Sequence, residues 1–128
     1  MERRSFAKAI IHLNHGLRSD WDVREIAKQL LRAGTSVAAN YRAVGRARSD
    51  KEFCAKLGLV VEESDESQLW LELLPEADPS IAGTMHKELL AEAGELTAIF
   101  TASHSSAKRN LANRKSDGNK RRAPMGER

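Results

Sequence analysis

The chain has a single cysteine, three prolines and few aromatic side chains, and no long hydrophobic run. One cysteine cannot form a disulfide within the chain, and Cys54 fits a small buried apolar residue in a reducing compartment. Lys8, His12 and Asn14 interrupt the first apolar stretch, so we expect neither a signal peptide nor a membrane span. The expectation is a cytoplasmic protein without a membrane partner.

Catalytic and metal-binding motifs are also missing. No G-x-S-x-G, Walker or dinucleotide fingerprint occurs, and no histidine lies three residues after a glutamate, as helical di-metal sites require. His12 and His15 could share one helix face, but two imidazoles do not complete a zinc site. We therefore expect no enzyme activity, cofactor, metal or small-molecule substrate, and surface positions for the histidines.

Apolar residues instead recur at intervals of three and four residues, which is the period of an amphipathic helix. Four such stripes begin at Phe6, Val23, Phe53 and Ala82. The stripes comprise Phe6, Ile10, Leu13, Leu17; Val23, Ile26, Leu30, Ala33, Val37, Asn40, Val44; Phe53, Leu57, Val60, Ser64, Ser67, Leu71, Leu74; and Ala82, Met85, Leu89, Glu92, Leu96, Ile99, Ser103. No convincing strand is found. The sequence predicts an all-α, antiparallel up-and-down four-helix bundle over residues 1–104.

Capping signals place the ends of these helices. Ser49 and Glu52 fit a capping box at the start of the third helix. Pro75 and Pro79 are expected to end that helix, and Asp78 followed by Pro79 suits the start of the fourth.

Charge is divided unevenly along the chain. Residues 1–104 carry a net charge of −3 and residues 105–128 carry +6. The C-terminal segment is rich in Lys, Arg, Asn, Ser and Gly and shows no apolar periodicity, so we expect a disordered tail. It would serve either as a solubilising extension or as an arm that contacts phosphates. Its candidate nucleic-acid contacts are Lys108, Arg109, Arg114, Lys115, Lys120, Arg121 and Arg122.

The predicted bundle has its own separation of charge. No Lys or Arg lies between Leu57 and His86, where the acidic side chains include Glu62 and Glu66. The preceding turn is basic, and its candidate nucleic-acid contacts are Arg42, Arg46, Arg48 and Lys51. Ordinary solvated faces would explain both runs. Alternatively, the acidic side of one copy meets the basic turn of another, which makes a heterologous contact and, we expect, a ring.

The third helix is apolar on more than one face. Leu69, Trp70 and Leu73 lie off its main stripe. A helix that is apolar beyond one stripe is either central to a large core or covered by another subunit. These three side chains, with Glu62 and Glu66, are therefore the candidate interface, and core packing is the alternative for Trp70. Trp21 is expected to close one end of the bundle.

Polar residues also fall on inward positions. Asn40 does so on the second helix, and Ser64 and Ser67 do so on the third. A buried amide without a partner costs about 1–3 kcal/mol. Asn40 is thus expected to hydrogen-bond Ser64, Ser67 or the Glu63 and Glu66 pair and to fix helix register; the alternative is that it faces solvent.

One combination of residues resembles a known family. The pattern is Ser36, Val37 and Asn40, a short basic linker ending at Ser49, then Glu52, Phe53 and a later Glu66. It resembles the bacterial four-helix-bundle family that includes the protein encoded in intervening sequences of 23S ribosomal RNA genes. The resemblance implies a homopentameric bundle with no established enzyme activity. Related bundles are accessory proteins of diversity-generating retroelements, in which basic surfaces contact nucleic acid and a reverse transcriptase.

The chain also departs from the family pattern. Ala43 and Val44 stand where many members have Glu-Gly, so no role of that glutamate is carried over. Glu62 and Glu63 replace a small Gly-Ser pair. The expectation is a self-assembling protein that binds RNA or another nucleic acid as an accessory factor; the alternative is an adaptor that binds only protein.

Overall fold

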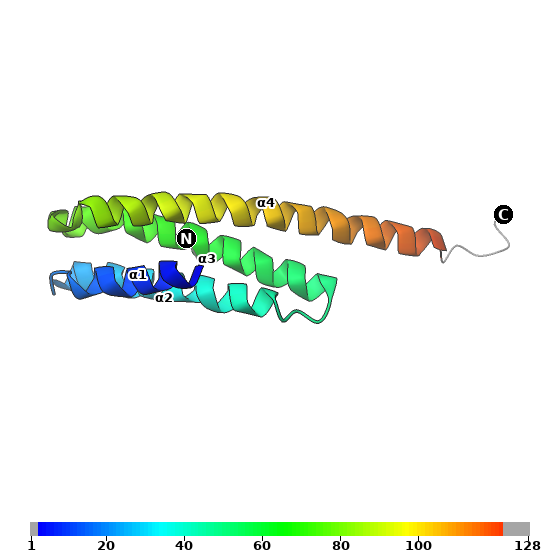
Figure 1. Cartoon of the computed structure of the whole chain (residues 1–128), viewed down its shortest axis with the longest axis horizontal. Helices are drawn as coiled ribbons and strands as arrows, with labels where there is room; N and C mark the ends of the chain where they lie inside the picture. Colours follow the sequence, from blue (N-terminus) through cyan, green and yellow to red (C-terminus); the bar gives the residue numbers. More distant parts are fainter. Residues whose placement is uncertain (1–2, 122–128) are drawn as a thin grey trace.

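Four α-helices make up the fold of the residues that the structure describes. The computed structural model describes residues 3–121, in the order α1 (Arg3–His15), α2 (Trp21–Val44), α3 (Asp50–Ala77) and α4 (Thr84–Arg121), with a 3₁₀ turn η1 (Pro79–Ile81) before α4. No strand occurs in this part of the chain. Successive helices run antiparallel (Figure 1), which confirms the predicted all-α up-and-down bundle.

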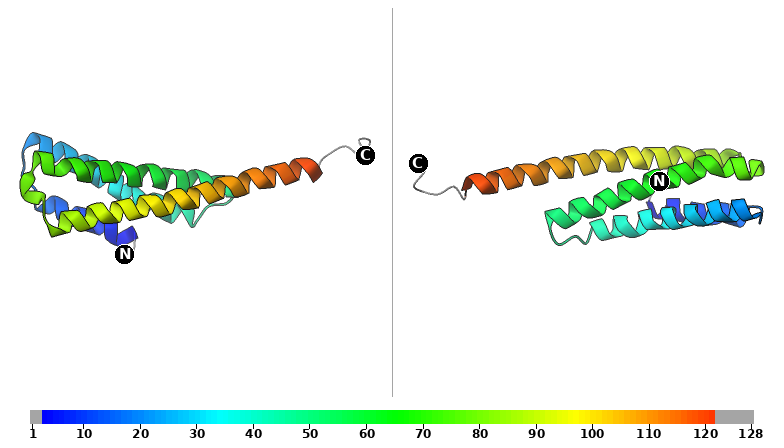
Figure 2. Two further views of the ribbon diagram at one scale, coloured as in Figure 1. Left: turned by 90° about the horizontal axis from the view of Figure 1, so that it is seen from above. Right: turned by 180° about the vertical axis from the view of Figure 1, so that it is seen from behind.

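The helices differ greatly in length, so the bundle is not uniform along its axis. At 1.5 Å per residue, α1 is about 20 Å long and α3 about 42 Å. α1 packs on α2 and α4, while α3 packs on α2 and α4. α1 therefore covers only one end of the molecule, and α2, α3 and α4 continue without it (Figures 1 and 2).

The core follows the predicted stripes over most of its length. Its buried side chains are Phe6, Ile10, Leu13, Val23, Leu30, Val37, Leu57, Val60, Leu71, Leu74, Leu89, Ala93, Leu96 and Phe100. The prediction was wrong at Met85 and Ile99, which are 52% and 48% exposed, and at Phe53, which is 40% exposed. It was also wrong at Ala82 and Ser103, which are exposed. In α4 the buried face passes through Ala93 and Phe100, one position beyond the predicted Glu92 and Ile99, although Glu92 is buried as well.

Glycine permits the close crossing of α1 and α2. A Cβ added at Gly34 would clash with Cδ1 of the fully buried Ile10. The C-terminal end of α2 has no α1 beside it (Figures 1 and 2).

The turn before α3 uses half of the predicted capping box. The hydroxyl oxygen of Ser49 accepts the backbone N–H of Glu52 at 3.0 Å, which caps the helix as predicted. The Glu52 carboxylate does not return to the cap; it lies 4.0 Å from the guanidinium of Arg48.

The prediction that Pro75 ends the third helix was wrong, because α3 continues to Ala77. Proline lacks the N–H that would bond the carbonyl of Leu71, four residues earlier. The Nε2 of buried His86 lies 2.6 Å from that carbonyl oxygen. Since a carbonyl only accepts, Nε2 must carry the proton. α4 thus supplies the hydrogen bond that Pro75 removes from α3.

Asp78 ties two turns together at the same end. It precedes η1 rather than α4, so the expectation that it caps the fourth helix was wrong. Its carboxylate accepts the backbone N–H of Arg18 and of Ser80, both at 3.2 Å, and the Ser80 hydroxyl at 2.5 Å. The Ser80 hydroxyl and the Arg18 N–H lower the pKa of this carboxyl. One buried side chain therefore joins the α1–α2 and α3–α4 connections.

α4 is longer than predicted. Residues 105–121, expected to form a disordered tail, continue the helix to Arg121, while residues 122–128 lie outside the described part of the chain. Residues 105–121 contain no proline, and Ala107 is partly buried against the core. Leu111 follows one helical turn later and is also half-buried. An apolar stripe thus extends beyond Ser103, and α4 projects past the α2–α3 turn (Figures 1 and 2).

Candidate nucleic-acid interface

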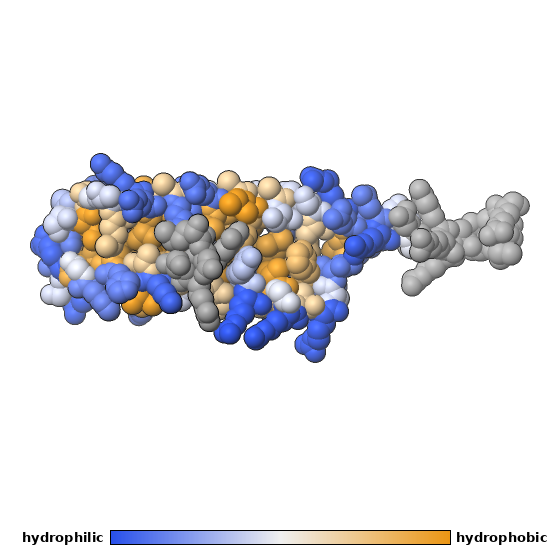
Figure 3. All heavy atoms as spheres, viewed as in Figure 1, coloured by the Kyte–Doolittle hydropathy of each residue, from blue (hydrophilic) through white to orange (hydrophobic). Residues whose placement is uncertain are grey.

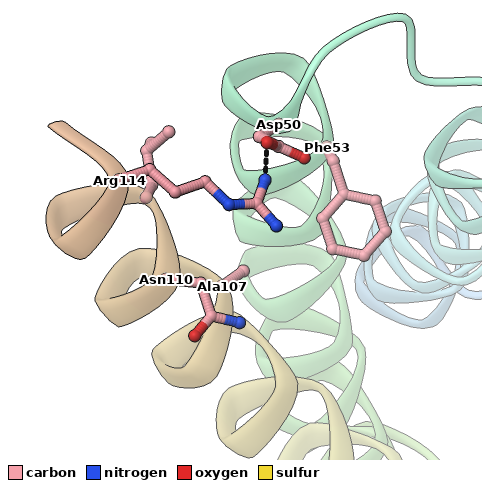
Figure 4. A pocket seen from close by; sticks show the side chains of 6 residues that line it. Asp50, Phe53, Ala107, Asn110 and Arg114 are labelled. Carbon is pink, nitrogen blue, oxygen red and sulfur yellow. Dashed lines mark ion pairs between the residues drawn. The ribbon is translucent and has the colours of Figure 1, made fainter. Parts of the chain in front are cut away.

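Two basic segments far apart in the sequence meet at one end of the molecule. Arg114 of α4 forms an ion pair with Asp50, the first residue of α3 (Figure 4). The tail helix therefore lies beside the basic turn. We call this region the basic end; its exposed side chains are Arg42, Arg46, Arg48, Lys51, Lys108, Arg109, Arg114 and Lys115. Figure 3 shows hydrophilic side chains gathered where α4 projects and apolar ones along the middle of the same face.

Few of these cations are engaged within the chain. Among the described residues, Arg114 pairs with Asp50 and the highly exposed Arg48 lies near Glu52. Arg109 donates to the Ser106 hydroxyl at 3.2 Å. The remaining ones have no ion pair within the described part of the chain. Arg122 and the side chains of Lys120 and Arg121 lie outside the described part of the chain.

Two hollows border the basic end, and Phe53 lines both of them. One is lined by Tyr41, Val44, Gly45, Phe53, Leu57, Ile99, Phe100 and Ser103. The other is lined by Asp50, Phe53, Ala107, Asn110, Leu111 and Arg114 (Figure 4). Sequence reasoning placed Phe53 in the core and did not single out Tyr41. The available signal was that both aromatic residues flank the basic turn, where α1 no longer covers the seam.

The candidate interface on α3 has an apolar and an acidic part. Leu69 and Leu73 are 45% and 38% exposed. Trp70 is half-buried against the core, and its indole N–H donates to the Glu66 carboxylate at 3.2 Å. Glu62 is exposed. The two leucines thus leave an uncovered apolar stripe, while Trp70 also contributes to the core.

Part of the acidic run is neutralised within the chain. Arg32 of α2 reaches α3 and pairs with Glu66 and, at 3.4 Å, with Glu63. The hydrogen bond from Arg32 lowers the pKa of Glu66. Burial raises the pKa of Glu63 despite the same partner. This contact between helices was missed in the sequence, because Arg32 lies outside the apolar stripe.

Asn40, Ser64 and Ser67 do not form the expected hydrogen bonds between helices that would fix their register. The Asn40 amide is half-buried and donates to the Ser36 carbonyl of its own helix at 2.9 Å. Ser67 is buried, and its hydroxyl donates to the Glu63 carbonyl, also within one helix, at 2.8 Å. The Ser64 hydroxyl is buried and has no hydrogen-bond partner within the described residues. Short side chains bond the preceding helical turn more easily than a neighbouring helix.

The remaining expectations concern histidine, cysteine and tryptophan. His86 is buried, so a surface position was wrong for it, whereas His12 and His15 are exposed. Cys54 is buried and free. Trp21 is 77% exposed and does not close the end of the bundle. The described residues contain no group of three or more side chains suited to a metal ion.

None of the helices in the described part of the chain is both long enough and apolar enough to cross a membrane.

Comparison with known proteins places the chain beside a described family and a solved structure. A family model described as "23S rRNA-intervening sequence protein" matches residues 2–102. The chain is also similar to a crystal structure of a protein of unknown function from the S23 ribosomal protein family of Bacteroides thetaiotaomicron. The two chains are 28% identical, with a TM-score of 0.71, and the match covers 80% of this chain and 94% of that one. No curated protein matches.

Proposed function

Because the chain belongs to the family of 23S rRNA-intervening sequence proteins, we propose that it is a non-enzymatic accessory protein that binds nucleic acid through its basic end and assembles with copies of itself. RNA or a reverse transcriptase is the proposed partner, and the cytoplasm is the proposed location. The family resemblance implies five subunits, and we adopt that number for the assembly.

One observation supports nucleic-acid binding most directly. The basic turn and the basic part of α4 lie at the same end of the molecule, because Arg114 contacts Asp50. Cations such as Lys108 and Lys115 that are exposed and unpaired among the described residues can contact phosphates and release bound counterions. Such contacts give affinity that depends on salt and little on sequence.

Charge reversal tests this proposal. The variant Arg42→Glu/Arg46→Glu/Lys108→Glu should lose most of its affinity for RNA, measured by fluorescence anisotropy at several salt concentrations. The matched control, Arg24→Glu/Lys28→Glu/Lys87→Glu, reverses three exposed cations outside the basic end. Equal affinity of both variants and the natural chain for RNA would contradict the proposal.

The exposed stripe on α3 supports self-assembly. Leu69 and Leu73 are apolar and exposed, and acidic residues such as Glu62 and Glu72 lie near them in the sequence. A second copy would cover the leucines and set these carboxylates near its basic turn, which is a heterologous contact able to close into a ring. Leu69→Ser/Leu73→Ser should reduce the sedimenting mass, whereas the control Met85→Ser should not. A strictly monomeric natural chain at low salt and micromolar concentration would refute assembly.

The same stripe supports the alternative function, an adaptor that binds another protein. In that case Leu69→Ser/Leu73→Ser would leave the sedimenting mass unchanged. If the natural chain folds but does not bind RNA, this alternative is favoured.

A further inference from the structure

We propose that the two hollows at the basic end form a binding track for single-stranded nucleic acid, in which Tyr41 and Phe53 stack on unpaired bases. This inference rests on the proposed nucleic-acid binding and adds the form of the ligand. The sequence alone did not indicate it, since the basic C-terminal segment contains no aromatic residue. The fold brings Phe53 to that segment, with which it lines one hollow, and sets Tyr41 in the other hollow that Phe53 lines.

The track exists because α1 is short. α1 stops short of the α2–α3 turn (Figures 1 and 2). Near that turn, residues of α2, α3 and α4 line a hollow that α1 does not cover. Along this opening, Tyr41 and Phe53 keep 42% and 40% of their surface exposed. The Tyr41 ring packs on Phe100, with centroids 5.6 Å apart, which holds it at the border of the hollow.

The two hollows adjoin at Phe53 and follow α4 from Ile99 to Arg114. This stretch is about 22 Å long at the helical rise of 1.5 Å per residue, which is the length of about six nucleotides stacked 3.4 Å apart. The larger hollow has a volume of about 330 Å³, at the low end of the range for pockets that enclose small ligands. The opening therefore suits a short stretch of strand.

Charge at the border favours a nucleic acid over an apolar peptide. Arg42 follows Tyr41, and Arg46 follows Gly45 of the hollow's lining. Lys108 follows Ala107, which lines the second hollow. Asp50 is the acidic group in the lining, and its ion pair with Arg114 offsets its charge.

Aromatic rings beside cations suit unpaired bases in particular. Every base has a face that stacks on an aromatic ring, so such platforms bind single strands with little sequence preference. A duplex keeps its bases stacked on one another and offers mainly phosphates to an open surface. We therefore expect the protein to prefer single-stranded over double-stranded nucleic acid. The Asn110 amide in the lining can hydrogen-bond an exposed base edge.

Binding of fluorescent oligonucleotides to the full chain tests the inference. Phe53→Leu and Tyr41→Leu should each weaken single-strand binding by about tenfold, the scale of one lost base stack. Duplex binding should change little, and the salt dependence of both should be unchanged because no charge is removed. Phe53→Tyr and Tyr41→Phe keep the rings and should keep the affinity. Trp21→Leu, which removes an exposed aromatic side chain outside the basic end, is the matched control. RNA and DNA strands of one sequence show whether the 2′-hydroxyl contributes.

Several results would overturn the track. Equal losses for single strand and duplex, or no loss for either, would exclude stacking while leaving phosphate binding intact. A natural chain that binds neither form would refute both the track and the proposed function. If Phe53→Leu changed the sedimenting mass instead of nucleic-acid affinity, the hollows would belong to a contact between proteins.

Discussion

At the scale of single residues, Glu92 is the side chain that fits its surroundings least. It is 8% exposed, and both carboxyl oxygens are buried without a hydrogen-bond partner in the described part of the chain. The sequence placed Glu92 on the inward stripe, and the structure places it there. Burial raises the pKa of its carboxyl, because the charged form loses its hydration.

Replacing Glu92 should therefore stabilise the fold. With the folded-state pKa raised, the folded protein holds this proton more tightly than the unfolded chain. Stability contributed by the neutral carboxyl is present below the unfolded pKa of about 4.3 and is lost as pH rises through the higher folded pKa. Glu92→Leu should increase the free energy of unfolding at pH 7 by about 1–2 kcal/mol, with a smaller gain near pH 4.

Urea denaturation at both pH values would measure this gain. Glu95→Leu, at an exposed position of the same helix, is the control and should change stability little. A loss of stability in Glu92→Leu at pH 7 would show that the carboxylate has a favourable partner in solution.

At the scale of helices, two contacts can be tested by substitution: the packing of α1 against α2 and a hydrogen bond between α4 and α3. The first is the crossing of α1 and α2 at Gly34. Alanine there would gain up to about 1 kcal/mol of helix propensity, but its Cβ would clash with the buried Ile10. Overpacking of a core costs about 1–3 kcal/mol.

Gly34→Ala should thus destabilise the natural chain and should be tolerated when Ile10→Val removes the clashing methyl group. Thermal unfolding of the two single variants and the double variant would show this as a favourable coupling. Gly34→Ala raising the melting temperature in the natural background would mean that α1 can move away from α2 at little cost.

The second contact is the hydrogen bond from His86 to the Leu71 carbonyl. His86→Leu should cost about 1–3 kcal/mol, because that buried acceptor loses its donor. In a Pro75→Ala background the restored backbone N–H can bond Leu71 within α3, so the same change should cost clearly less. A double-mutant cycle by urea denaturation measures this coupling. A coupling energy near zero would show that the His86 hydrogen bond does not compensate for Pro75.

The helices themselves were predictable from the sequence, but several of their contacts were not. Stripes such as Leu57, Val60 and Leu71 fix which face of a helix is buried, and Ser49 fixes a helix start, because these signals are local. The path of α3 through Pro75 was not predictable, since it depends on a donor fifteen residues away in α4. The helical tail was missed because Ala107 and Leu111 form too short a stripe to outweigh the charged composition around them.

At the scale of the whole molecule, the exposed basic residues of the α2–α3 turn and of α4 lie at the end that α1 does not reach. The predicted basic residues of the turn and the tail were found in the sequence as separate groups, and only the fold shows that they share one end. The aromatic part of the candidate site was missed, because the length of α1 decides whether Tyr41 and Phe53 are covered. Local patterns do not report such a difference in helix length.

The balance of charge at the basic end gives a prediction for the whole molecule. Asp50→Asn removes the carboxylate that pairs with Arg114 and leaves that guanidinium available for phosphate. If the end binds single strands, affinity at low salt should rise severalfold. The slope of log affinity against log salt should steepen by about 0.7, the value for one more phosphate contact.

Anisotropy titrations over a range of salt concentrations would measure both quantities. Asp65→Asn, which removes an exposed charge from the acidic part of α3, should leave them unchanged. Weaker binding in Asp50→Asn would indicate that the ion pair positions α4 for binding. The loss of that positioning would then outweigh the gain from a free Arg114 guanidinium.

The short first helix also has a consequence for motion. Amides of α2 and α4 that lie beside α1 are enclosed within four helices, whereas residues 41–57 and the outer part of α4 have fewer neighbours. Regions with few buried contacts open locally at lower free energy than the whole fold, so hydrogen exchange should be faster in these segments. A ligand seated between them would slow that exchange, and its affinity would include the free energy of holding the loosest part of the molecule closed.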